Sequence, residues 1–232
     1  MAAYAVGQRG KGDLLNESFH KSGEAPRRRS AYQDVLDAPR HMVAEVVDGT
    51  LTLNPGPSAR HVWASSSLGI EVGSPFGRGR GDPGGWWIIN EPELHFGEHG
   101  TDIVVPDIAG WRHGTMPEYP DAEYLEITPD WACEVLSPGM RAFDLGRKRA
   151  VYAREAAGHL WFVGPGAKML EAFELREGRR ALLDTLSDDA AVSLTPFGAI
   201  SFPLDALWPE DSAPTAGHGS ASSDFAEKTR ES

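Results

Sequence analysis

Two acidic residues stand inside apolar stretches that otherwise have the composition of buried β-strands. Asp107 lies within VVPDIAGW (residues 104–111), and Glu134 lies within WACEVLSP (residues 131–138). A carboxylate in a low-dielectric interior is costly unless it is protonated, paired with a cation or bound to a metal ion. Alternation along each strand assigns each acid to one face, so we expect the two carboxylates to converge if the strands are neighbours.

Converging carboxylates offer oxygen ligands of the kind that Mg²⁺ prefers, and Mn²⁺ uses similar ligands. Such an ion polarises a phosphoryl oxygen and makes hydroxide available near neutral pH, so the pattern indicates metal-assisted hydrolysis. Two structural interpretations stay open from spacing alone. Asp107 can begin a turn after Pro106, and Glu134 can pair with an arginine such as Arg141 or Arg147.

A polar stripe on the helix predicted after the second acidic stretch is the next candidate. In residues 140–158, Asp144, Lys148 and Tyr152 recur every four residues and therefore share one helix face. The ordinary interpretation of Asp144 and Lys148 is a surface ion pair, and the alternative is a stripe that overhangs the two carboxylates. Glu45, just before a predicted hairpin turn, reaches either solvent or the site.

The histidines and the single cysteine receive structural interpretations. His95 and His99 lack the helical H-E-x-x-H pattern and flank a glycine, which favours loop positions. His61 falls in the first turn of a predicted helix, where we expect a core or capping role. Cys133 excludes an intrachain disulfide, cannot supply a thiolate metal site alone, and is interpreted as a small buried hydrophobe.

Length and composition predict one globular domain, because 232 residues with 41% hydrophobic side chains suffice for one sizeable core. We place this domain at residues 30–209. Residues 1–29 and 210–232 are rich in small and charged side chains and are predicted to be disordered tails. No apolar run reaches the length of a membrane span and no signal-peptide pattern occurs, so we expect a cytoplasmic protein without membrane association.

The net charge of −12 argues against a simple nucleic-acid binder, because phosphate contacts need clustered lysine and arginine. Residues 1–29 hold six basic and three acidic side chains, and residues 210–232 hold two and five. The region between them keeps fourteen basic and twenty-six acidic side chains, so the domain itself carries the whole excess. The sequence alone indicates no basic groove.

The predicted elements give a mixed α/β order of helix, three strands, helix and strand. The first helix follows Ser58, a good N-cap, and the second ends at Gly158, a good C-terminal cap. The Asp48-Gly49 pair predicts a hairpin turn, and glycine and proline predict a loop at residues 73–85. The segments are helices at 30–38, 58–72 and 140–158, a hairpin at 42–55, strands at 86–96, 102–111, 130–138 and 159–166, and an antiparallel pair at 168–175 and 181–187.

Five segments in order resemble the Uma family of restriction-endonuclease-like proteins, a branch of the PD-(D/E)XK nuclease superfamily. They are AEVVDGTL, PSARH, VVPDIAGW, ACEVLSPGMRAFDLGRKRAVYAREA and HLWFVGP, and the resemblance spans about residues 31–208. It implies a restriction-endonuclease-like core, with a central mixed sheet flanked by helices, an N-terminal hairpin and extra C-terminal strands. It also implies that Asp107 and Glu134 bind Mg²⁺ or Mn²⁺, that Glu45 is a third acidic member, and that DNA is the substrate.

The sequence departs from the superfamily pattern at two positions. The superfamily has a lysine two residues after the second acid, where this chain has Leu136, and an apolar side chain cannot orient water or stabilise charge. The resemblance therefore points to Lys148 as a migrated replacement with Asp144 as its partner. Gly164 is the second departure, because relatives often carry an acid there.

Three functions are compatible with these observations. The first is a Mg²⁺-dependent endonuclease with Asp107, Glu134, Lys148 and Glu45 in its site. The second is a catalytically silent, homodimeric interaction module, which the acidic surface and exposed-looking aromatics at residues 86–87 would suit. The third is a hydrolase of a small phosphorylated compound, which would need no extended basic groove.

Overall fold

The computed structural model describes residues 32–80, 83–97, 101–137 and 144–210. The tails predicted at residues 1–29 and 210–232 lie outside these ranges, except for Glu210, as do His99 and Arg141. In the described ranges, no helix has the length and apolar character needed to span a membrane.

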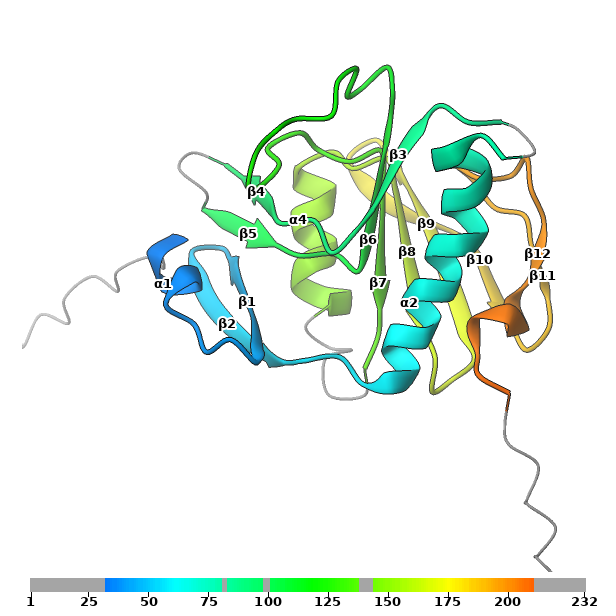
Figure 1. Ribbon diagram of the computed structural model, residues 1–232, viewed down its shortest axis with the longest axis horizontal. Coiled ribbons are helices and arrows are strands. Elements are labelled where there is room, and N and C mark those ends of the chain that lie inside the picture. The colour runs from blue at the N-terminus through cyan, green and yellow to red at the C-terminus, as the bar shows by residue number, and fades with distance from the viewer. Residues whose placement is uncertain (1–31, 81–82, 98–100, 138–143, 211–232) are drawn as a thin grey trace, which may run out of the picture.

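The centre of the fold is a six-stranded sheet of order β10-β9-β8-β7-β6-β3 (Figure 1). Strands β7 and β8 are parallel and the other neighbours are antiparallel, so the sheet is mixed, as predicted. Its strands are β3 (Trp86–Asn90), β6 (Ile108–Arg112), β7 (Trp131–Val135), β8 (His159–Gly164), β9 (Met169–Arg176) and β10 (Arg179–Ser187).

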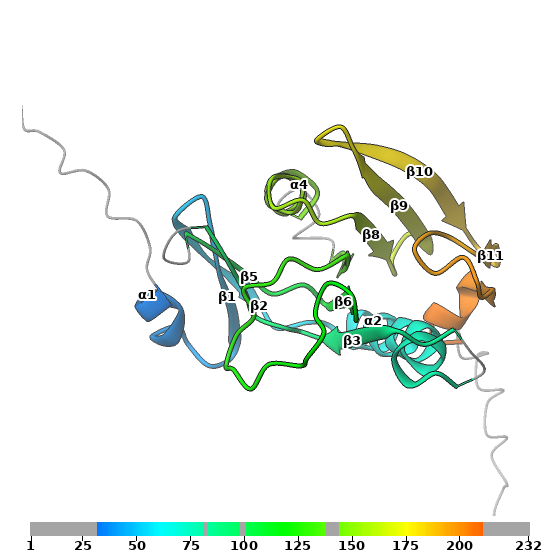
Figure 2. The same ribbon diagram turned by 90° about the horizontal axis from the view of Figure 1, so that it is seen from above.

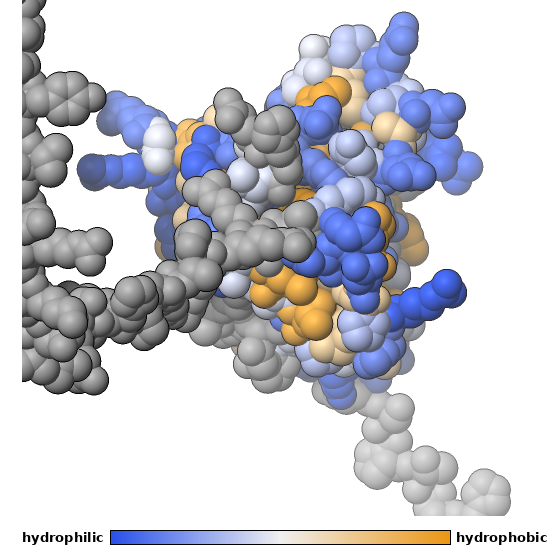
Figure 3. All heavy atoms as spheres, turned by 90° about the vertical axis from the view of Figure 1, so that its left-hand side faces the viewer, coloured by the Kyte–Doolittle hydropathy of each residue, from blue (hydrophilic) through white to orange (hydrophobic). Residues whose placement is uncertain are grey.

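A second sheet of order β2-β1-β5-β4 lies at the left of Figure 1, next to the short helix α1 (Tyr32–Leu36). Its strands are β1 (Met42–Val47), β2 (Thr50–Pro55), β4 (Leu94–Phe96) and β5 (Asp102–Val104). The predicted hairpin is confirmed: Asp48 and Gly49 have φ of 51° and 67°, as a two-residue turn between twisted strands requires. On this side of the molecule, a group of hydrophobic side chains is bordered by hydrophilic ones (Figure 3).

Two predicted strands are each divided between the two sheets. Residues 86–96 form β3 and β4, with a break at Glu91, whose φ is 48°. Residues 102–111 form β5 and most of β6, with a break at Pro106 and Asp107. Asp107 therefore lies in the link just before β6, and the prediction that it occupies a strand is wrong.

Helices α2 (Ala59–Val72) and α4 (Arg149–Arg154) cover opposite faces of the large sheet (Figure 2). The Ser58 hydroxyl caps α2 as predicted, because it accepts a hydrogen bond from the backbone N–H of His61. After Val72 the chain forms a π-helical turn, η1 (Gly73–Gly77), so the predicted loop at residues 73–85 is helical at its start.

The end of α4 differs from the prediction. A π-helical turn, η2 (Asp144–Lys148), precedes the helix, which ends at Arg154. Ala156, with φ of 61°, takes the left-handed position that Gly158 was predicted to occupy. Gly158 has a packing role instead, because a Cβ there would lie 3.1 Å from the Asp130 carbonyl oxygen.

Hydrophobic cores fill both faces of the large sheet. On the α2 face, Trp86, Trp131, Trp161 and Phe197 pack together, and β11 (Ala191–Val192), β12 (Phe202–Pro203) and the 3₁₀ turn η3 (Leu204–Leu207) close this core. On the α4 face, Val151 and Tyr152 belong to the other core. Trp86 is only 3% exposed, so its predicted place at an exposed interface is wrong.

Replacing Gly110 with alanine is expected to lower the free energy of unfolding by about 1–3 kcal/mol through overpacking. A Cβ at Gly110 would lie 2.9 Å from Ile88 Cδ1 and 3.3 Å from the rings of Trp131 and Trp86. Urea unfolding followed by tryptophan fluorescence measures the change. Gly114→Ala is the matched control, because a Cβ there meets no atom within 4 Å. Equal unfolding midpoints for the two variants would contradict the close packing around β6.

Candidate active site

A lysine ammonium buried between two carboxylates is the centre of the site. Lys148 is 2% exposed, and its Nζ lies 2.9 Å from Glu45 Oε1 and 2.7 Å from Glu134 Oε2. The ammonium also donates to the Val105 carbonyl oxygen at 3.2 Å. The interpretation of Lys148 as part of a surface ion pair is therefore wrong; the side chain of Asp144 lies outside the described ones.

Glu134 enters the site from β7 because of strand alternation. Its neighbours Cys133 and Val135 belong to the core on the α2 face, so Glu134 points toward α4. Lys148 and Tyr152, four residues apart, both reach it: the Tyr152 hydroxyl donates to Oε1 at 2.6 Å. The stripe thus overhangs Glu134, as its alternative interpretation predicted.

Glu45 reaches the site and not solvent, being only 1% exposed on β1. Its Oε1 accepts a hydrogen bond from the Val105 backbone N–H at 2.8 Å, besides its contact with Lys148. Its Oε2 accepts one from the Asn54 amide at 3.3 Å. Glu45 thereby fastens the β1–β2 hairpin to the link between β5 and β6.

Asp107 sits where β6 begins beside β7. Its Oδ2 accepts a hydrogen bond from the Val135 backbone N–H at 2.6 Å, so the carboxylate continues the β6–β7 ladder. Its Oδ1 contacts His61 Nε2. The backbone of Asp107 does bend after Pro106, as the structural interpretation predicted. Its side chain nevertheless takes part in the site through its contacts with Val135 and His61.

His61 is the residue that sequence reasoning missed. Only its backbone takes part in capping α2, whereas its imidazole contacts Asp107. The Nδ1 atom is buried and has no hydrogen-bond partner among the described residues. The sequence carried one signal, the placement of His61 in the first turn directly after the cap, but the contact spans 46 residues and depends on packing.

Solvent reaches the site at its Asp107 side. The side chains of His61 and Asp107 are 13% and 14% exposed, whereas those of Glu45, Glu134 and Lys148 are 4% exposed or less. A small ligand therefore meets Asp107 and His61 before it meets the buried lysine.

The charges of the site do not balance. Glu45, Asp107 and Glu134 are acidic, and Lys148 is the lysine that lies between two of them.

Burial raises the pKa of the Cys133 thiol well above its usual value, and the negative charges of Asp107 and Glu134 raise it further. Cys133 is consequently the neutral, buried hydrophobe that the sequence predicted.

The donor set suits a hard divalent cation. Carboxylate oxygens prevail, and one dication would neutralise the excess charge of three carboxylates over one ammonium. No ready cluster of three or more acidic, histidine or cysteine ligands occurs in the described part of the chain. Lys148 holds Glu45 and Glu134, so an incoming cation would compete with its ammonium for Glu134.

The other candidates lie apart from this centre. His95, on β4, stacks on Tyr124 with ring centroids 3.8 Å apart and contacts Glu93 at 2.6 Å. Leu136 is buried in the core on the α4 face. Leu136 is thus an apolar side chain at the position where the resemblance predicted a lysine, and Lys148 brings an ammonium to Glu134 from the turn before α4.

Comparisons with known proteins identify a family and a similar fold. Residues 30–205 match the family model Uma2, described as "Putative restriction endonuclease". A solved structure from Anabaena variabilis, described as "a putative nuclease belonging to DUF820", superposes with a TM-score of 0.61 at 19% identity. The match covers 76% of this chain and 96% of that one. This similarity confirms the predicted restriction-endonuclease-like fold. A search of curated proteins found no match to the chain.

Lys148→Met is expected to lower the free energy of unfolding by about 3–5 kcal/mol, because it leaves Glu45 and Glu134 buried without their ammonium. Denaturant unfolding measures the loss. The double variant Lys148→Met/Glu134→Gln should recover part of it, since one of the two uncompensated charges is gone. Arg179→Met, at the exposed start of β10, is the control and should change stability by less than about 1 kcal/mol. A similarly small loss for Lys148→Met would contradict the buried ion pairs.

Proposed function

The chain belongs to the Uma2 family, and we propose that it is a metal-dependent endonuclease that hydrolyses DNA phosphodiester bonds. The observation that carries the proposal is the buried ammonium of Lys148 between Glu45 and Glu134, beside the more accessible Asp107. Acids that could hold a divalent cation, beside an ammonium that could stabilise negative charge on a phosphate, suit metal-assisted phosphodiester hydrolysis.

Asp107 and Glu134 would hold the ion, which is Mg²⁺ or Mn²⁺. When bound, such an ion polarises a phosphoryl oxygen and lowers the pKa of a bound water. His61 Nε2 lies against Asp107 Oδ1, so an imidazole nitrogen is also at hand. A nitrogen donor suits a transition metal better than Mg²⁺, so of the two ions His61 would favour Mn²⁺.

Lys148 would orient the attacking water and stabilise the negative charge that develops on the phosphate. Its ammonium is directed by three acceptors: Glu45 Oε1, Glu134 Oε2 and the Val105 carbonyl oxygen. Glu45 acts through Lys148 and is a positioning residue. Tyr152 holds Glu134 in the same way, by donating to its other oxygen.

The silent interaction module has less support. It rested on the acidic surface, on Leu136 and Gly164, and on an exposed aromatic interface. Of these grounds, the structure weakens two, because Lys148 brings an ammonium to the site in place of a lysine at position 136 and Trp86 is buried. A hydrolase of small phosphorylated compounds would use the same residues, and the choice of DNA rests on the family description.

Asp107→Ala, Glu134→Ala and Lys148→Ala are each expected to reduce cleavage of supercoiled DNA in Mg²⁺ or Mn²⁺ by about 10²-fold or more. The loss follows from removing a metal ligand or the group that stabilises charge, and gel assays of nicked and linear products measure it. Glu174→Ala, a partly exposed residue on β9, is the control and should cleave normally. Normal cleavage by Asp107→Ala would rule out this site.

His61→Ala is expected to raise the Mn²⁺ concentration needed for half-maximal binding by about 10–100-fold, as loss of a ligand or of its supporting contact does. The readout is the metal-induced rise in melting temperature, which requires no catalysis. Exchange of Mn²⁺ for Mg²⁺ should shrink the difference between variant and parent if the imidazole binds the ion. An unchanged Mn²⁺ response would show that His61 has only a structural role.

A further inference from the structure

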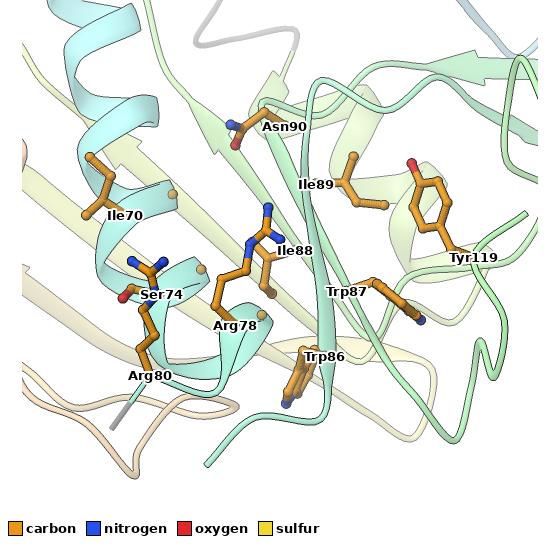
Figure 4. Close-up of a pocket in the computed structure, with 13 residues that line it drawn as sticks. Ile70, Ser74, Arg78, Arg80, Trp86, Trp87, Ile88, Ile89, Asn90 and Tyr119 are labelled. Atoms are coloured by element: carbon orange, nitrogen blue, oxygen red, sulfur yellow. The ribbon is translucent and has the colours of Figure 1, made fainter. Parts of the chain in front are cut away.

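A groove of about 760 Å³ runs between α2 and η1 on one side and β3, the edge strand of the large sheet, on the other (Figure 4). Three glycines four residues apart, at positions 69, 73 and 77, form the helical wall. Without side chains there, the helix lies close to β3: a Cβ at Gly73 would lie 3.8 Å from Ile88 Cγ2. The glycines therefore let the side chain of Ile88 approach the backbone of the helical wall.

The groove is positively charged on an acidic protein. Arg78 and Arg80 line it, and none of its described lining residues is acidic. Neither arginine forms an ion pair with a described residue, and Figure 4 shows the Arg78 guanidinium between η1 and β3. Arg112 adds a third guanidinium at the same end, 4.5 Å from the ring centroid of Trp86. A polyanion is the complementary ligand.

Two aromatic rings lie on the other side of β3 from the arginines (Figure 4). Trp87 and Tyr119 are 5.6 Å apart between ring centroids, and Tyr119 is 54% exposed. The Trp87 indole N–H donates to the Met116 carbonyl oxygen at 2.9 Å, which fixes the ring. Because β3 stands between these rings and the arginines, the argument for a polyanion rests on the guanidinium groups.

Most of the aliphatic side chains that line the groove pack against the hydrophobic cores. Ile88 and Ile89 pack against the two cores, one on each face of the sheet. Ile70 is the largely exposed aliphatic residue of the groove, at 66%. A protein partner would need more free apolar surface, so the charge decides the class of ligand.

The groove leads to the candidate active site. Its Asn90 end pairs with Ile108, the residue after Asp107, and the Glu91 N–H donates to the Asp107 carbonyl oxygen at 3.0 Å. Helix α2 follows the same course, from His61 beside Asp107 to the arginines after its C-terminus. At 1.5 Å per residue this is roughly 25 Å, or about seven nucleotides of one DNA strand.

We infer that this groove binds the sugar–phosphate backbone of the DNA strand that flanks the scissile phosphate, with Arg78 and Arg80 contacting phosphates about seven nucleotides away. The inference rests on the proposed endonuclease function, which supplies the scissile phosphate. The positively charged groove would let an otherwise acidic domain bind a polyanion locally.

Arg78→Ala/Arg80→Ala tests the charge. Binding of a labelled DNA duplex of about 30 base pairs is measured by fluorescence anisotropy in EDTA, at several salt concentrations. The variant should bind about 10–100-fold more weakly, with a salt slope smaller by about two. Arg176→Ala/Arg179→Ala, at the β9–β10 turn on the opposite edge of the sheet, removes the same charge and should change nothing.

Gly73→Gln tests the shape without changing charge. Gly73 has ordinary helical backbone angles and room for a Cβ, so the substitution should preserve the fold while its side chain fills the groove. We expect weaker binding of the long duplex with the salt slope of the parent. Gly114→Gln is the control, and thermal melts of all variants check the fold.

Parent-like affinity and salt slope in Arg78→Ala/Arg80→Ala would overturn the inference, and so would a parent protein that binds no DNA. A change from dimer to monomer in light scattering with DNA binding unaltered would assign the groove to an interface between copies and would also overturn it. Loss of DNA binding in this variant, combined with no cleavage by the parent in any metal, would support the groove and sink the proposed endonuclease. Cleavage by the parent, together with unaltered DNA binding in all groove variants, would support the proposed endonuclease and overturn the assignment of the groove.

Discussion

The interaction on which the structure depends is the neutralisation of buried carboxylates by Lys148. Glu45 comes from the small sheet, Glu134 from the large sheet, and the ammonium from the turn that leads into α4. Either acid left alone would carry an uncompensated charge into the interior, so the ammonium holds two sheets and a helix together. The interaction that stabilises the fold is thus also the one that places a cation beside the acids that would bind a metal ion.

The sequence revealed the charged residues of the site but not all of their partners. Asp107 and Glu134 interrupt apolar runs, so local patterns singled them out. The stripe of Lys148 and Tyr152 left two interpretations open, and the resemblance assigned Lys148 to the site. The backbone of Asp107 was predicted wrongly because residues 102–111 read as one strand. Proline lacks the N–H that would continue a ladder, so the chain changes sheets at Pro106, and Asp107 lies in the link just before β6.

Contacts between distant segments account for the rest. His61 joins Asp107, and Glu45 joins Lys148, only because α2 and the small sheet pack where they do, and hydrophobic periodicity carries no information on that packing. Trp86 and Trp87 are both apolar neighbours in sequence, yet alternation sends the first into the core and leaves the second half-buried. At the end of α4, alanine adopts the left-handed angles for which glycine was expected, a choice that propensity disfavours but does not forbid.

The overall charge and the family description conflict only if charge is averaged over the surface. Salt screens exposed charges beyond about 8–10 Å, so a DNA strand responds to the residues it passes and not to the net charge of −12. The glycine-rich segment that seemed a plain loop forms a π-helical turn, and this turn carries Arg78 and Arg80 to the edge strand that leads to Asp107. The negative charge on the rest of the protein surface would weaken DNA binding outside the groove. On the proposed function, DNA is then retained chiefly where the groove and the metal site are occupied together, which favours binding in the register that cleavage needs.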